Sequence, residues 1–326
     1  MISFEARRNQ VSKIRMAVVG AGEFGRNHIR VIAENPRAEL TAIMDTDAAR
    51  AGELAKQFHC TGTEDLAEIA ALADAAVVAV PTTAHSETGI RLMEMGLHVL
   101  VEKPIADNLA SARELVHVAE RTGRILQVGH LERFNPAVTA LTKAVTLPLF
   151  FEVHRMSVFT PRSLDIDVVL DLMIHDLDIV LSLVGEMPEE IRAAGLSILS
   201  GKVDIANVRL AFPGGCVANL TASRVSTERV RKLRLFQPEQ YISADYTRQE
   251  AVAFSVSKNR QISFNKLPVT AGEPLQFEIE SFLESIQKGV RPMVSGEEAL
   301  LALEVAVAIL DKIEEHSKAV AKALAH

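Results

Sequence analysis

The chain is poor in cysteine, and this shortage excludes two kinds of stabilised scaffold. Only Cys60 and Cys216 occur in its 326 residues, and both lie in apolar segments typical of strands. Two distant cysteines build neither a disulfide framework nor a zinc site. We therefore expect a protein of a reducing compartment.

Long apolar runs and long basic runs are also missing. No segment approaches the ~18 apolar residues of a membrane span, and the first residues carry charges without the apolar core of a secretory signal. The formal net charge is -7, and the basic runs are short, as at 229–234. Nucleic-acid binding proteins usually show a basic footprint. We expect a cytoplasmic protein that binds neither nucleic acid nor membrane.

The pattern of apolar runs changes once along the chain, and this predicts two domains. With 48% hydrophobic and 24% charged residues, the composition is that of a globular protein. From residue 16 to about 130, short apolar runs alternate with helical segments, as in a doubly wound parallel sheet. After a helix at 135–145, strand-like runs follow one another with short turns, and two helices end the chain. We predict an α/β fold with an N-terminal domain at 1–130 and, at 131–326, an α+β domain with a large, mostly antiparallel open sheet.

A glycine-rich turn follows the first apolar run and predicts a Rossmann dinucleotide-binding domain. Gly20, Gly22 and Gly25 form G-x-G-x-x-G between a strand and a helix. In that context the glycines allow a tight turn, close approach of a pyrophosphate and close helix packing. Asp45 ends the next strand, where a carboxylate binds ribose hydroxyls and disfavours a 2′-phosphate. We expect NAD, with NADP as the lesser option because Arg50 lies nearby. A ligand-free turn and a solvated Asp45 are the alternatives.

A later helix has one polar stripe in an otherwise apolar surface. In the segment 167–185, polar residues fall within about 40° of one another at 100° per residue: Asp171, His175, Asp178 and Ser182, with Asp167 at the edge. Buried carboxylates are costly unless they border water, a ligand or cations. We predict that His175 is a general base and that Asp171 orients it or binds substrate. A helix cap at Asp167 with solvent-facing neighbours and a metal site are the alternatives, although no further ligand stands at a familiar spacing.

Lys103 ends an apolar strand at 98–103 and is followed directly by Pro104. Ligands of open α/β sheets bind at the carboxyl ends of the strands. An ammonium there can stabilise the negative charge that develops on a substrate oxygen during oxidation. The proline restrains Lys103 to extended geometry, so we predict that this lysine is aimed at the reacting group.

Five motifs in order resemble the glucose-fructose oxidoreductase, inositol dehydrogenase and MocA family of NAD(P)-dependent sugar and cyclitol dehydrogenases. They are VGAGEFGRNH, VPTTAH, EKP, QVGH and DVVLDLMIHDLDIV, and the similarity extends from Met16 to the end of the chain. The resemblance implies that Lys103, Asp171 and His175 are catalytic. It also implies a homodimer or homotetramer formed through the open sheet. The residues expected at the dinucleotide are Gly20, Gly22, Glu23, Phe24, Gly25, Asp45, Pro81, Thr82, His85, Glu102, Lys103 and Gln127.

The segments GHLERFNPAV and FFEVHRMSVFTPR resemble the branch of this family that oxidises the 3-hydroxyl of UDP-N-acetylglucosamine and related nucleotide sugars. In that branch an aminotransferase converts the 3-keto product to a 3-amino sugar for lipid A or other surface glycans. Guanidinium groups suit a diphosphate. The residues expected at the substrate are Arg133, Asn135, Arg155, Arg162, Lys103, Asp171 and His175, although each arginine is also compatible with a surface or sheet-edge position.

Two other functions stay open. One is a dehydrogenase of a free sugar, a cyclitol or a dihydrodiol. The other is a non-catalytic regulator that senses dinucleotide. A regulator of this kind is expected to have lost catalytic residues, whereas Lys103, Asp171 and His175 are all present.

Overall fold

The computed structural model describes residues 13–160, 166–257 and 259–324. The described residues form two compact units, the first made of those within 13–129 and 275–296 and the second of those within 130–274 and 297–324. The division near residue 130 was expected from the sequence. The segment 275–296 differs from the expectation, because it joins the first unit although it lies within the range 131–326.

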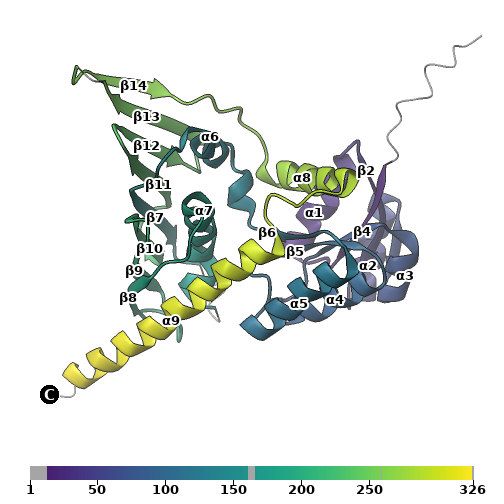
Figure 1. Ribbon diagram of the computed structural model, residues 1–326. Coiled ribbons are helices and arrows are strands. Elements are labelled where there is room, and N and C mark those ends of the chain that lie inside the picture. The colour runs from purple at the N-terminus through teal and green to yellow at the C-terminus, as the bar shows by residue number, and fades with distance from the viewer. Residues whose placement is uncertain (1–12, 161–165, 258, 325–326) are drawn as a thin grey trace, which may run out of the picture. The chain divides into compact units, whose positions relative to one another are not determined.

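The first unit contains a six-stranded parallel sheet of order β3-β2-β1-β4-β5-β6, with helices packed around it (Figure 1). This is the order of the Rossmann fold. The four residues of β4 are buried, as expected where both faces of a parallel sheet are covered. The short β3 was not foreseen. The strands are β1 (Ile14–Val19), β2 (Ala38–Met44), β3 (Thr61–Thr63), β4 (Ala75–Val78), β5 (His98–Glu102) and β6 (Leu126–Gly129).

Helix α8 (Pro274–Lys288) lies far along the sequence but completes the core of the first unit. Its Ile279, Phe282 and Leu283 are fully buried in one cluster with Met16 and Val18 of β1. Burial of this apolar face explains why the chain returns to the first sheet. The other helices of this unit are α1 (Glu23–Glu34), α2 (Ala48–Phe58), α3 (Leu66–Leu72), η2 (Thr82–Ala84), α4 (His85–Glu94) and α5 (Leu109–Thr122).

The second unit contains an eight-stranded sheet of order β14-β13-β12-β11-β7-β10-β9-β8. Neighbouring strands are antiparallel except β10 and β7, which are parallel, so the predicted mostly antiparallel open sheet is confirmed. The strands are β7 (Phe150–Val158), β8 (Glu190–Leu196), β9 (Ile205–Ala211), β10 (Val217–Ser226), β11 (Val230–Gln237), β12 (Gln240–Asp245), β13 (Glu250–Val256) and β14 (Ile262–Lys266).

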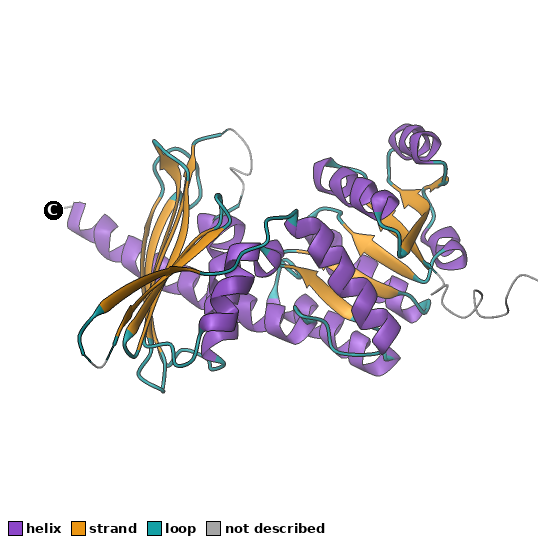
Figure 2. Cartoon of the chain, turned by 90° about the horizontal axis from the view of Figure 1, so that it is seen from above, coloured by secondary structure: helices purple, strands orange, loops and turns teal. Residues whose placement is uncertain are grey.

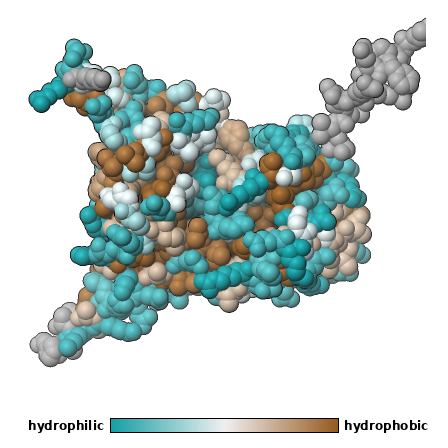
Figure 3. Space-filling view, viewed as in Figure 1, coloured by the Kyte–Doolittle hydropathy of each residue, from teal (hydrophilic) through white to brown (hydrophobic). Residues whose placement is uncertain are grey.

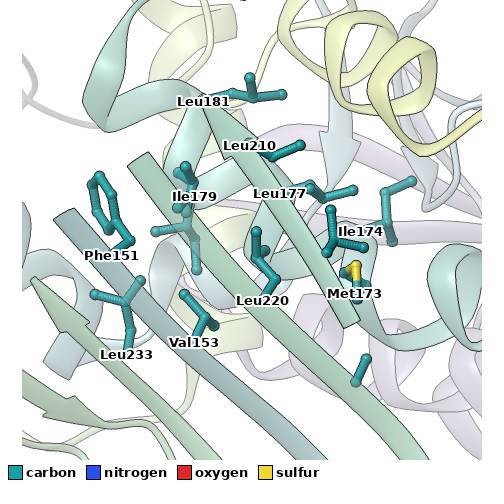
Figure 4. Packing of buried hydrophobic residues seen from close by; sticks show 14 of the residues in the cluster. Phe151, Val153, Met173, Ile174, Leu177, Ile179, Leu181, Leu210, Leu220 and Leu233 are labelled. Carbon is teal, nitrogen blue, oxygen red and sulfur yellow. The ribbon is translucent and has the colours of Figure 1, made fainter. Parts of the chain in front are cut away.

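Helices cover one face of this sheet (Figure 2). Alternate strand residues point into the core beneath them, where Leu220 and Leu233 pack with Leu177 of α7 (Figure 4). The helical elements of this unit are η3 (Leu131–Phe134), α6 (Pro136–Ala144), the π turn η4 (Val169–Met173), α7 (Ile174–Val184) and α9 (Gly296–Leu324). Among the described residues, no helix is both long and apolar enough to cross a membrane.

Candidate functional site

The glycine turn between β1 and α1 has the geometry of an anion-binding loop. Gly20 has φ of +95°, and a Cβ there would lie 2.5 Å from the oxygen of Ala79. A Cβ on Gly25 would lie 1.8 Å from the oxygen of Gly20, so neither position accepts a side chain. A Cβ on Gly22, the N-cap of α1, would meet nothing within 4 Å. No side chain caps this helix start, so its amides and its dipole face the space that a pyrophosphate would fill. The turn fits a dinucleotide.

Asp45 follows β2 and is held as a carboxylate beside this turn. Its Oδ2 accepts from the amide of Ala21 at 2.7 Å, and its Oδ1 accepts from the amide of Asp47 at 2.9 Å. Burial opposes ionisation, but these amides and Arg50, whose Nη1 lies 3.3 Å from both oxygens, lower the pKa of Asp45 below its ordinary value. An ionised carboxylate with further lone pairs can accept from ribose hydroxyls.

Lys103 follows the last residue of β5, and its neighbour Glu102 is tied into the unit. The Glu102 Oε1 lies 2.8 Å from Nε2 of His28 on α1, and Oε2 accepts from the amide of Lys103 at 3.2 Å. Burial raises the pKa of Glu102, but the contact with His28 and the charge of Lys103 outweigh it, so the net shift is downward. A Cβ on Gly129 would lie 3.1 Å from Oε2 of Glu102. The peptide bond between Lys103 and Pro104 is cis. The strand end that carries Lys103 is thus fixed by contacts from α1 and β6.

His85, the first residue of α4, contacts the backbone of two neighbouring loops. Its Nδ1 lies 2.8 Å from the oxygen of Pro104, and its Nε2 lies 3.0 Å from the oxygen of Val80. Burial lowers the pKa of His85 despite these carbonyls. The ring joins the chain after β4 to the chain after β5, and its contact with a cofactor stays a prediction. Pro81, which precedes η2, is exposed, and Thr82, its first residue, is half-buried. Glu23 and Phe24 open α1 on the surface.

Gln127 of β6 is bound to helix α8 inside the first unit. Its side chain is fully buried, and its Nε2 donates to the backbone oxygen of Glu278 on α8 at 3.1 Å. The prediction that Gln127 lines the cofactor therefore finds no support in this geometry. Gln127 is buried because helix α8 returns to the first unit and packs on it, and this return could not be predicted from the sequence.

Glu278 is a buried carboxyl that the sequence analysis missed. Its side chain is fully buried, and neither oxygen has a hydrogen-bond partner among the described residues. Burial, together with the nearby charge of Glu102, raises the pKa of Glu278 well above its ordinary value. A glutamate at the edge of an apolar helix stripe was the signal that could have found it.

In the second unit, Asp171 and His175 lie on successive parts of one helical segment. Asp171 belongs to the π turn η4, and His175 belongs to the first turn of α7; both are partly buried. The amide of Ile174 donates to the oxygen of Val169, five residues back, which defines the π turn. The ring of His130 packs edge-on against that of His175, with centroids 6.2 Å apart. A π turn at a functional segment is a recurrent feature of enzymes, and the uniform 100° step did not predict it.

The side chain of Asp167 does not cap this helix. Its Oδ1 accepts from the amide of Val203 at 2.8 Å, which ties the start of the segment to the chain before β9. A helix cap made by the Asp167 side chain is therefore not supported, although its backbone oxygen accepts from the amide of Asp171 at 3.0 Å.

Arg155 of β7 lies in the core of the second unit and not on a substrate surface. Its side chain is 2% exposed, Nε and Nη2 donate to the two oxygens of Asp176 at 2.6 and 3.0 Å, and Nη1 donates to Glu132 at 3.0 Å. The ring of Tyr246 lies 5.5 Å from the guanidinium. Burial raises the pKa of Asp176, and Arg155 opposes that shift. The expectation that Arg155 serves a diphosphate is not supported, because buried carboxylates occupy it. Asp176, which follows His175 directly, was missed.

Two other residues expected at the substrate also have partners within this unit. Asn135 is buried and caps α6, accepting from the amide of Ala137 at 3.1 Å and donating to the oxygen of Tyr246 at 3.1 Å. Arg133 of η3 lies 3.4 Å from Oδ1 of Asp178 and 3.7 Å from Glu298. Arg162 lies outside the described residues.

Lys103 belongs to the first unit and Asp171 and His175 to the second, so their joint action stays a prediction. Within the part of the chain that the structure describes, no three His, Cys, Asp or Glu residues are grouped as a metal site.

Comparison with known proteins gives full-length relatives. Residues 14–130 match the model of an oxidoreductase family with an NAD-binding Rossmann fold, and residues 149–240 match the GFO/IDH/MocA C-terminal domain. The chain is 34% identical over 307 residues to UDP-N-acetylglucosamine 3-dehydrogenase of Acidithiobacillus ferrooxidans, which covers 91% of this chain and 97% of that protein. It is 27% identical to inositol 2-dehydrogenase of Rhizobium meliloti over 93% of this chain and 97% of that one.

Solved structures of related proteins have the same fold as this chain. The structure of the Acidithiobacillus ferrooxidans enzyme superposes with a TM-score of 0.88 at 32% identity, over 93% of this chain and 99% of the other. Levoglucosan dehydrogenase with NADH and levoglucosan gives a TM-score of 0.85 at 19% identity, over 94% and 98% of the two chains, and shows the shared fold alone.

Proposed function

The chain belongs to the GFO/IDH/MocA family of oxidoreductases, and from this premise we propose that it oxidises the 3-hydroxyl of UDP-N-acetylglucosamine, or of a closely related nucleotide sugar, to the 3-keto sugar with NAD. Membership makes it a dehydrogenase that acts on CH–OH groups with a nicotinamide dinucleotide. The observation that carries the choice of substrate is the full-length 34% identity to a UDP-N-acetylglucosamine 3-dehydrogenase.

We assign the chemistry to three side chains. His175 takes the proton of the substrate hydroxyl as general base. The ammonium of Lys103 donates a hydrogen bond to the same oxygen and stabilises the charge that develops on it. Asp171, one turn before His175, orients the imidazole or binds a neighbouring hydroxyl. The nicotinamide accepts the hydride from the carbon when the dinucleotide is bound.

The residues of the first unit support NAD over NADP. The turn at Gly20, Gly22 and Gly25 would hold the pyrophosphate, and the ionised Asp45 would bind the ribose hydroxyls and repel a 2′-phosphate. Arg50 is paired with Asp45 and so does not offer an isolated cation to such a phosphate. Isothermal titration should show tighter binding of NAD than of NADP. Equal affinities would contradict this assignment.

The activity is tested with purified protein, NAD and UDP-N-acetylglucosamine, with an aminotransferase added to remove the keto product. We expect NADH to form, and Lys103→Ala or His175→Ala to reduce kcat by a factor of about 100 or more. Glu190→Gln, an exposed change on the second unit, is the matched control and should leave kcat unchanged. NAD binding by Lys103→Ala and His175→Ala should survive. Turnover of inositol or free glucose without turnover of the nucleotide sugar would reject the proposed substrate and favour the free-sugar alternative.

We further propose that an aminotransferase consumes the 3-keto product and that the resulting 3-amino sugar enters lipid A or another surface glycan. The dinucleotide-sensing alternative predicts binding without turnover. A thermal-shift panel of UDP-sugars and free sugars with NAD present separates the three possibilities, because a ligand stabilises the state that binds it.

The uncovered face of the eight-stranded sheet suggests how copies assemble. Aromatic rings form a continuous row across five strands, with centroid distances of 5.7, 4.8, 5.5 and 5.0 Å: Phe150, Phe236, Tyr241, Phe254 and Phe264. Phe264 is 56% exposed. In Figure 3 hydrophobic residues interrupt the polar surface near β11 and β12.

Exposed apolar rows of this kind mark protein interfaces. We propose a homodimer or homotetramer formed through this face. Light scattering of wild type and Phe264→Asp should show dissociation of the variant. A monomeric wild type at micromolar concentration would contradict the proposal.

A further inference from the structure

A cavity of about 240 Å³ lies in the second unit beside the C-terminal half of α7. Its polar lining includes Arg133, Asp178 and Ser182, and its apolar lining includes Leu181, Met187 and Leu301. At ~30 Å³ per water, the cavity has room for about eight waters, or for a small organic group.

Asp178 is the chemically unusual member of this lining. Its side chain is 1% exposed, its Oδ1 lies 3.4 Å from Nη1 of Arg133, and its Oδ2 has no hydrogen-bond partner among the described residues. Burial raises the pKa of Asp178 to about 6, which leaves it largely ionised at neutral pH. A buried acceptor without a partner is costly, so a ligand that donates an N–H or O–H to Oδ2 would recover that cost.

Arg133 places a donor beside this acceptor. Its two terminal nitrogens lie 3.4 Å from Asp178 and 3.7 Å from Glu298, both longer than the ~2.7–2.9 Å of a tight charge-assisted hydrogen bond. A carbonyl oxygen in this cavity can accept a hydrogen bond from the guanidinium of Arg133. An acceptor, a donor and apolar side chains in one small cavity complement an acetylated amine, which has an N–H, a C=O and a methyl group.

The position of the cavity relative to His175 limits which part of a nucleotide sugar it can hold. Asp178 follows His175 by one turn of the same helix, a rise of about 4.5 Å. Ser182, seven residues after His175, lies within about 20° of it around the helix axis. In UDP-N-acetylglucosamine the acetamido group is on C2, directly beside the C3 that would react at His175. The uracil ring, which also carries N–H and C=O groups, lies beyond the diphosphate and is much farther from C3.

We infer that this cavity is the subsite for the 2-acetamido group of the sugar, with Asp178 accepting its N–H, Arg133 donating to its C=O, and Leu181, Met187 and Leu301 contacting its methyl group. This inference depends on the proposed function, because it places the reacting C3 at His175. Arg133 thus acts on the sugar and not on the diphosphate. The cavity makes the enzyme select an acetylated amino sugar over its 2-hydroxy counterpart.

The test compares kcat/KM for UDP-N-acetylglucosamine and UDP-glucose in the full-length enzyme with NAD and a trap for the product. Wild type should prefer the acetylated substrate. Asp178→Ala should reduce that preference by about 10–100-fold, corresponding to about 1.4–2.8 kcal/mol. Arg133→Met should act in the same direction, and Glu190→Gln should leave the preference unchanged. Asp178→Asn, which preserves shape, serves if the alanine variant melts at a much lower temperature.

Three outcomes would overturn the inference. One is an equal loss for both substrates in a folded Asp178 variant, which would indicate a structural role. Another is a loss of UDP affinity by calorimetry in the same variant, which would place the uracil ring in the cavity. The third is a wild type without preference for the acetylated sugar.

If wild type oxidises no nucleotide sugar, the proposed function fails by itself. Binding of free N-acetylglucosamine, but not of glucose, observed by saturation-transfer NMR in wild type and lost in Asp178→Ala would then still support the acetamido subsite.

Discussion

Replacement of Asp176 by leucine tests whether the buried ion pair behind His175 holds the second unit together. Asp176 binds Arg155 through both oxygens at 2.6 and 3.0 Å, and each side chain is 2% exposed. Removal of one partner leaves a buried, partly compensated guanidinium, and such losses cost about 3–5 kcal/mol. For a unit of this size that corresponds to a decrease of about 6–20 °C in Tm.

Calorimetry or circular dichroism would measure this shift. The matched control is Glu250→Gln, which breaks a pair between Lys266 and Glu250 at 3.0 Å with side chains 68% and 48% exposed. Exposed pairs contribute about 0–1 kcal/mol, so this variant should melt close to wild type. The double variant Arg155→Met with Asp176→Leu should recover part of the loss, because no charge then stays buried alone. If Asp176→Leu costs no more than Glu250→Gln, the ion pair does not stabilise the unit as argued.

Three other perturbations have defined outcomes. Gly25→Ala should unfold or strongly destabilise the first unit, because its Cβ would lie 1.8 Å from a backbone oxygen. Gly22→Ala, whose Cβ has open space, should keep the wild-type Tm but bind dinucleotide more weakly in calorimetry. Equal Tm values for the two variants would refute this contrast. The raised pKa of Glu278 means that the folded state keeps a proton that the unfolded chain loses above about 4.5, so stability decreases as the pH rises past that value. Glu278→Gln should lessen that decrease in urea titrations at several pH values, and an unchanged slope would refute it. Asp204→Ala should cost about 1–3 kcal/mol in the same assay, because the amides of Ile198, Leu199 and Ser200 lose their acceptor; a cost near zero would contradict this.

Local patterns allowed a good part of the fold to be predicted from sequence. The glycine turn and Asp45 could be placed because their spacing fixes a strand, a turn and a helix in immediate succession. The eight strands of the second sheet could be anticipated because alternating apolar residues bounded by turn residues leave few other structures open.

Long-range partners could not be predicted in this way. Asp176 and Arg155 are 21 residues apart, and only the packing of α7 on β7 shows that they bind each other and not a ligand. Gln127 was expected at the cofactor, but its side chain is buried and donates to the backbone of α8, which lies about 150 residues later in the sequence. The π turn before His175 is a tertiary feature, since Val, Leu and Met at 169–173 fit an ordinary α-helix equally well.

The return of α8 also limits how this protein can be divided or recombined. The chain passes between the two units three times, after residues 129, 274 and 296. A fragment cut at residue 130 would lack Ile279, Phe282 and Leu283 and would expose the apolar surface of β1 and α1 that they cover. A chimera that exchanges the dinucleotide module of one relative for another must therefore carry both pieces, or it will join a sheet to a helix selected for a different partner.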